Sequence, residues 1–179
     1  MKTTRSIIRN QSLKVVALFG LLALAVTTLW AASSGNIILS GAVATINDIT
    51  ITPQSGYNSL NLTTGGTDQT VAVVNEKNNS FLGYSVTLAS ANALLGQARL
   101  KGTDVLNSNV INYSIKYGVA GSEASVTLNA LTGTATVTDV TAPTASGGVN
   151  KNLKITFSGS SYQNADTYSD TLTLTIISK

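Results

Sequence analysis

The chain of 179 residues contains no cysteine and no histidine, and it has only one methionine, one tryptophan and two prolines. Without cysteine it can form no disulfide framework, and without cysteine or histidine it can form no Cys/His zinc site. The lack of histidine also excludes a Ser-His-Asp triad and a haem held by a histidine ligand. We therefore expect no cofactor, no metal and no catalytic residues.

Charged residues make up only 11% of the chain, and the positive ones are unevenly placed. Four of the eleven cations, Lys2, Arg5, Arg9 and Lys14, lie within the first fourteen residues. Beyond them, seven Lys and Arg stand against eight Asp and Glu, which gives a net charge of −1. The formal charge of +3 therefore comes from the first segment. A basic surface for nucleic acid is not expected on the rest of the protein.

Residues 1–33 have the order of a secretory signal peptide. The cations are followed by the apolar run Val15–Val26 and then by small residues at Ala31–Ser34, which is the order that export and cleavage require. Cleavage after Ser33 would leave small residues at the third and the first position before the cleavage site, the two positions that signal peptidase recognises. The alternative is a permanent membrane anchor, but twelve apolar residues are few for a span of about 20. We expect a secreted protein whose mature part, residues 34–179, is a single domain.

From Gly35 onward, short runs rich in Thr, Val and Ile are separated by turns rich in Gly, Asn and Ser. In the last run, apolar residues alternate with threonine, which is typical of a half-buried strand. Ala89–Leu100 has helical spacing, but Gly96 interrupts it, so at most a helical turn or a loop is expected there. The predicted strands are Asn36–Leu39, Ala42–Thr52, Ser59–Thr63, Gln69–Asn75, Gly83–Ala89, Val110–Tyr117, Ser125–Leu131, Thr134–Val140, Leu153–Ser158 and Thr171–Ser178. This pattern predicts an all-β fold, an antiparallel immunoglobulin-like β-sandwich.

The segment just after the predicted signal peptide is apolar and strand-prone. Ile37, Leu39 and Val43 fall on one face of an extended chain, with Gly41 as a gap between the last two. Such a segment has two possible fates. It can pair within its own domain as a first strand, or it can complete the sheet of a neighbouring molecule by β-strand addition. The residues alone leave these two alternatives open.

At this point the sequence resembles a known class of proteins. The alternating N-terminal segment with a glycine, the cysteine-poor all-β body and the C-terminal stretch Ala165–Ile176 resemble bacterial fimbrial subunits of the chaperone–usher class. The similarity is greatest to archaic pilins and spore-coat-U-like domains, whose closing strand often reads G-x-Y-x-D-x-[LV]-x-[LV]-x-[LVI]. Matching positions are Tyr168, Asp170, Leu172, Leu174 and Ile176, whereas Ala165 or Asp166 stands where glycine is usual. Asn75–Leu88 also resembles a hairpin of these domains, but the cysteines of many such pilins are absent.

The resemblance implies a mechanism of assembly. The subunit would be a sandwich that lacks one strand, held open by a periplasmic chaperone until an outer-membrane usher inserts the N-terminal segment of the next subunit. Ile37, Leu39, Gly41 and Val43 would form the donor strand. The acceptor groove and closing strand would include Tyr168, Leu172, Leu174 and Ile176. Head-to-tail contacts of this kind do not close, so they build fibres, and the protein would be a structural subunit of a surface fimbria, pilus or biofilm matrix.

Two other functions are compatible with the sequence. The first is a monomeric secreted adhesin or carbohydrate-binding module, for which tyrosines or rows of threonine could form a ligand surface. The second is a secreted hydrolase with two converging carboxylates. The eight acids are scattered along the chain, and Asn75–Asn79 reads as a turn, so we interpret the acids as solvated loop residues. The protein is accordingly expected not to be an enzyme.

Overall fold

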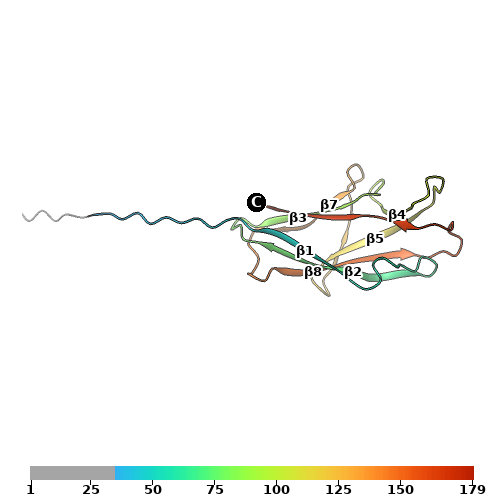
Figure 1. Ribbon diagram of the computed structural model, residues 1–179, viewed down its shortest axis with the longest axis horizontal. Helices are drawn as coiled ribbons and strands as arrows, with labels where there is room; N and C mark the ends of the chain where they lie inside the picture. The colour runs from blue at the N-terminus through green and yellow to red at the C-terminus, as the bar shows by residue number, and fades with distance from the viewer. Residues whose placement is uncertain (1–34) are drawn as a thin grey trace, which may run out of the picture. The chain divides into compact units, whose positions relative to one another are not determined.

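The computed structural model describes residues 35–179, and the predicted signal peptide lies outside this range. The chain divides after Ala42, so that Val43–Lys179 form one compact unit and the described residues 35–42 belong to another. Val43–Lys179 is all-β, as predicted, with two antiparallel sheets packed against each other (Figure 1). Among the described residues, no helix is long and apolar enough to cross a membrane.

The two sheets differ in size. In spatial order, the larger sheet contains β1 (Asn47–Pro53), β2 (Gly65–Asn78), β8 (Val149–Ser158), β5 (Val110–Gly118), β4 (Ala98–Gly102) and β9 (Tyr168–Ser169), with β6 (Ala124–Val126) also paired to β5. The smaller sheet contains β10 (Leu172–Ser178), β3 (Tyr84–Ser90) and β7 (Thr134–Val140). In this order β1 is an edge of the larger sheet and β10 is an edge of the smaller one.

The core lies between the sheets and follows the period of two that the sequence shows. In β3, side chains alternate between buried and half-buried along the whole strand, and β5 and β8 repeat the alternation. The buried apolar side chains of these three strands are Tyr84, Val86, Leu88, Ile111, Tyr113, Ile115, Tyr117, Leu153, Ile155 and Phe157. Their burial is the largest favourable contribution to folding, at about 25 cal/mol per Å² of apolar surface removed from water.

Two predicted strands are absent from the structure and two are shorter than expected, one of them Ser125–Leu131, where only the three residues of β6 form a strand. Asn36–Leu39 forms no strand, and β1 begins at Asn47 rather than at Ala42. Ser59–Thr63 forms turns instead of a strand. The reason is local, because the side-chain Oδ1 of Asn61 accepts the backbone N–H groups of residues 63 and 64, at 3.2 and 3.1 Å, and this bends the chain.

Other strands are longer than expected or were missed. β4 begins within Ala89–Leu100, the stretch expected to be a loop or helical turn, and ends beyond it at Gly102. Leu95 and Gly96 both take positive φ, which allows a tight turn just before the strand. β2 begins at Gly65 and ends at Asn78, so it includes Gly65–Asp68 and Asn75–Asn78, two stretches whose Gly, Asn and Asp residues are typical of turns. A register shift between Gly66 and Gln69 interrupts the pairing of the first stretch with β8, which accounts for its turn-like composition.

Candidate functional site

The edge strands β1 and β10 approach each other at one end of the sandwich. The side chain of Asn78 is 1% exposed, and its Nδ2 donates to Oδ1 of Asn47 at 2.6 Å and to Oγ of Ser178 at 2.8 Å. Ser178 Oγ also donates to Asn47 Oδ1 at 2.8 Å. We call these three residues the polar clasp, and this end of the sandwich, where the C-terminus lies in Figure 1, the closed end.

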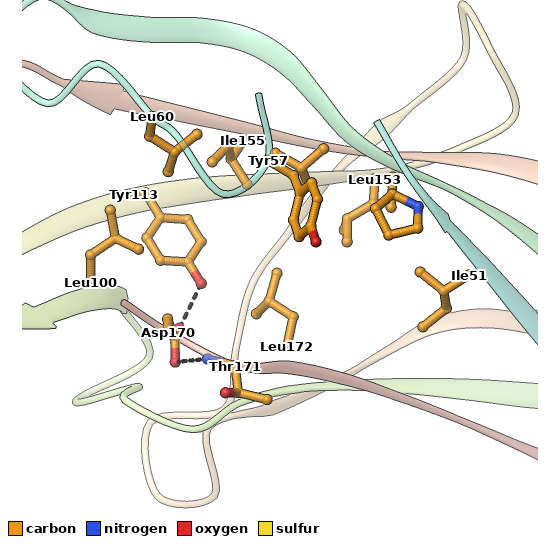
Figure 2. A pocket seen from close by; sticks show the side chains of 13 residues that line it. Ile51, Tyr57, Leu60, Leu100, Tyr113, Leu153, Ile155, Asp170, Thr171 and Leu172 are labelled. Atoms are coloured by element: carbon orange, nitrogen blue, oxygen red, sulfur yellow. Dashed lines mark hydrogen bonds between the residues drawn. The ribbon is translucent and has the colours of Figure 1, made fainter. Parts of the chain in front are cut away.

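Away from the polar clasp, a cleft separates β1 from β10, and it contains a cavity of about 310 Å³. Figure 2 shows Ile51 to the right of Leu172, with Leu153 and Ile155 above them. The remaining lining residues are Pro53, Tyr57, Leu60, Val71, Ala72, Leu100, Tyr113, Asp170 and Thr171. We call this space the edge cleft. Its walls are mainly aliphatic and aromatic, so it suits apolar side chains.

The edge cleft continues into a second cavity of about 440 Å³. Tyr57, Leu60, Leu100 and Asp170 line both cavities. The second cavity is more polar because Asn58, Asp166 and Thr167 contribute to its walls. We call this end of the sandwich, near Pro53 and Leu172, the open end.

The edge of β10 that faces away from β3 has no partner strand in the described part of the chain. The residues that flank β10, at positions 171 and 179, form backbone hydrogen bonds of 3.0 Å with the chain of β3, and the pairing with β3 has no irregularity. Because antiparallel residues alternate between facing the partner strand and facing away, the even-numbered residues direct their N–H and C=O groups to the unpaired edge. These residues are Leu172, Leu174 and Ile176. The same residues therefore present inward apolar side chains and outward backbone groups.

The edge of β1 that faces away from β2 also has no partner strand among residues 35–179. Residues 46 and 54, at its two ends, form backbone hydrogen bonds with the chain of β2, at 3.4 and 2.9 Å, and the register between them is regular. The backbone groups of Ile49 and Ile51 thus face away from β2. Pro53 has no N–H to offer. An extended chain placed between β1 and β10 could therefore bond to either strand.

Asp170, which lines both cavities, is held in place by four hydrogen bonds. Its Oδ2 accepts hydrogen bonds from the hydroxyls of Tyr113 and Ser90, both at 2.6 Å, and its Oδ1 accepts those of the backbone N–H groups of Asn92 and Thr171, at 3.0 and 2.8 Å. Burial, together with the hydrogen bond to and the charge of Asp170, raises the pKa of Tyr113 above its ordinary value. The phenol therefore remains a donor at neutral pH, and this network holds the start of β10 against β3 and β5.

Of the four predicted groove residues, Leu172 alone lines the edge cleft, while Leu174 and Ile176 follow it along β10. Leu174 is buried, while Leu172 and Ile176 are half-buried against the core. Tyr168 lies elsewhere, in β9 of the larger sheet, where it pairs with Gly102 of β4. It lines the second cavity, and its hydroxyl donates to the backbone C=O of Asn164 at 3.0 Å.

The predicted donor residues are exposed. Ile37, Leu39 and Val43 are 85%, 90% and 89% exposed, and no strand is assigned before Asn47 in the described part of the chain. Apart from its two neighbours in the chain, no described residue has an atom within 4 Å of the place that a Cβ of Gly41 would take. The local surroundings of Gly41 therefore do not explain why a glycine stands there.

Several cleft residues were not identified from the sequence. The alternation of Ile49 and Ile51 with threonine in β1 could have indicated that edge, because it matches the pattern used for β10. Tyr57, Leu60 and Leu100 come from turns and from the missed strand β4, and no local pattern marks them. In residues 35–179, no group of three or more acidic side chains is placed to hold a metal ion. No protein-family model matches this chain, and no curated protein matches it either.

Proposed function

We propose that this protein is a structural subunit of a secreted surface fibre, a fimbria, pilus or matrix fibre, that assembles by β-strand complementation. The observation that carries the proposal is the edge cleft. Its apolar cavity lies between two strand edges that have no partner strand within the residues that the structure describes, an arrangement that binds an extended segment by main-chain hydrogen bonds and side-chain pockets. An apolar edge left open in this way is otherwise an aggregation hazard.

The N-terminal segment has the properties that the edge cleft requires. Ile37–Val43 has seven residues, the same number as β10, and it presents apolar side chains with a period of two. Each aliphatic side chain that leaves water on insertion contributes about 1.5–3 kcal/mol. Donation to a second copy leaves that copy's own segment exposed, so the contact repeats and builds a fibre.

The direction of insertion follows from the shape of the cleft. The polar clasp joins β1 and β10 at Asn47 and Ser178, whereas the cavity lies near Pro53 and Leu172. A donor segment is covalently joined to its own folded body after Val43, so that end has to leave through the open end. The donor strand would therefore run antiparallel to β10, with Val43 closest to Leu172.

The second cavity favours one alternative function. Tyr57 is half-exposed at its rim, and Asn58, Asp166 and Thr167 supply polar groups. An aromatic face next to such groups is suited to carbohydrate. On this alternative the protein would be a monomeric adhesin or carbohydrate-binding module, and the edge cleft would stay empty.

The test is polymerisation of the mature chain, residues 34–179, followed by size-exclusion chromatography and negative-stain microscopy. Leu39→Asp places a charge on the face predicted to enter the cleft, so it should abolish fibres. Ile38→Asp is the matched control, because Ile38 is 91% exposed and points to the opposite face of an extended chain. We expect fibres from the wild type and from Ile38→Asp. Fibres from Leu39→Asp, or a wild type that stays monomeric at high concentration, would refute the proposal.

A further inference from the structure

The chain between the donor segment and β1 is fixed to the sandwich from Ala44 onward. Asn79 fixes it, because its Nδ2 donates to the backbone C=O of Ala44 at 2.8 Å and its Oδ1 accepts the N–H of Ile46 at 2.7 Å. Asn79 lies at the closed end, directly after β2, and is followed by the turn 80–83, whose ends are joined by the hydrogen bond from Gly83 N to Ser80 O at 2.9 Å. The donor segment therefore starts beside this turn.

This anchoring leaves almost no linker. Val43, the last predicted donor residue, is next to Ala44, and consecutive Cα atoms are about 3.8 Å apart. If Val43 occupies the open end of a neighbouring subunit, the Asn79–Gly83 turn has to lie against that open end. The two folded bodies cannot hang apart on a flexible tether. They must form a second interface.

Both surfaces that would meet carry exposed apolar side chains. Phe81 and Leu82, in the turn beside Asn79, are 81% and 52% exposed. At the open end, Val105, Leu106 and Tyr162 are 97%, 91% and 94% exposed. Both surfaces thus expose large apolar side chains to water. Such surfaces are typical of regions that become covered in an assembly.

The two loops of the open end are joined to each other by hydrogen bonds. Loops 103–109 and 159–167 meet around Asp166, which accepts hydrogen bonds from Thr103 Oγ1 at 2.9 Å, Asn107 Nδ2 at 2.8 Å and the backbone N–H groups of residues 104 and 167. These hydrogen bonds, chiefly that from Asn107, lower the pKa of Asp166 to about 2. The exposed side chains of both loops are thus presented on one ordered surface.

We propose that the Asn79–Gly83 turn of one subunit packs against the open end of the next, with Phe81 and Leu82 covered by Val105, Leu106 and Tyr162. The partner is a second copy of this chain. The inference rests on the proposed function, because it needs the donor segment to be inserted through the open end. It adds an interface that would fix the angle between successive subunits.

The test uses the mature chain with two introduced cysteines, Phe81→Cys and Leu106→Cys. Since the protein has no cysteine of its own, every disulfide formed is attributable to this pair. Fibres are oxidised, denatured without reductant and separated by size. We expect ladders of covalent oligomers, with at least tenfold fewer oligomers longer than dimers from either single variant. The matched control is Phe81→Cys with Val119→Cys, because Val119 is 51% exposed and follows β5 at the closed end; this pair should form no ladder.

The outcomes separate the two proposals. Wild-type fibres with no ladder from the Phe81/Leu106 pair overturn the second interface and leave strand complementation standing. Equal ladders from the control pair also overturn it. A wild type that forms no fibres overturns both. As a second measurement, Phe81→Asp should lower the temperature at which fibres dissociate while leaving the melting temperature of the monomer unchanged, and an unchanged dissociation temperature contradicts the interface.

Discussion

Replacing Glu76 by glutamine should destabilise the sandwich more than any surface substitution. Glu76 is fully buried between the sheets and accepts hydrogen bonds from Tyr84 at 2.9 Å, Tyr117 at 2.7 Å and Thr138 at 2.8 Å. It also pairs with the ammonium of Lys151 at 3.3 Å. Burial, followed by the hydrogen bond to Glu76, raises the pKa of both tyrosines, so both stay protonated and continue to donate.

The size of the destabilisation follows from the groups that lose their partner when glutamine replaces Glu76. The amide is neutral, so it no longer compensates the charge of Lys151, whose side chain is 13% exposed. One carboxylate oxygen also becomes an NH₂ group that faces other donors. Removing one partner of a buried ion pair costs about 3–5 kcal/mol. For a domain of this size, that corresponds to a melting temperature lower by about 10–20 °C.

The assay is thermal or urea unfolding of the wild type, E76Q, K151M and E76Q/K151M. The double variant should lose less free energy of unfolding than the sum of the two single losses, because the second change removes the stranded charge. Lys77→Met is the control; Lys77 follows Glu76 on the opposite face of β2, and a change within about 0.5 kcal/mol is expected. A loss below about 1 kcal/mol for E76Q would show that the network contributes little.

Two further predictions concern other parts of the sandwich. The hydrogen bond from Lys154 lowers the pKa of Glu123 to about 2 from its ordinary value of 4.5, so the stabilising effect of this carboxylate is present above pH 4.5 and is lost as the pH falls toward 2. Melting temperature should therefore fall less steeply over this interval for Glu123→Gln than for the wild type, and parallel curves would contradict this. Leu174→Ala should cost about 2–5 kcal/mol of unfolding free energy, because Leu174 is 8% exposed. The neighbouring Ile177→Ala, at 57% exposure, should cost far less, and similar losses in urea unfolding would refute the burial pattern.

The sequence predicts the all-β class and most of the strands because period-two alternation is a local signal. Thr134–Val140 has the predicted bounds, and β10 differs from its predicted strand by one residue. Such runs need no distant partner to be recognised, since each places its apolar side chains on one face by itself.

The features that were missed depend on residues distant in sequence. Glu76 was interpreted as a solvated turn residue, yet it is buried because tyrosines from β3 and β5 and a lysine from β8 surround it. β4 was missed because its only two buried apolar side chains, Ala98 and Leu100, contribute too short an alternation. The edge cleft likewise results from the order of strands in two sheets, which no single stretch of sequence encodes.

The central claim is that the edge cleft accepts the N-terminal segment of another copy. The most direct measurement is the melting temperature of the mature chain lacking residues 36–43, recorded with and without a synthetic peptide of residues 36–44. At a peptide concentration 100 times its Kd, binding should add about 2.7 kcal/mol, a rise of about 8 °C. The same peptide carrying Asp in place of Leu39 should give no rise. An unchanged melting temperature with the native peptide, or an equal rise with both peptides, would contradict the account.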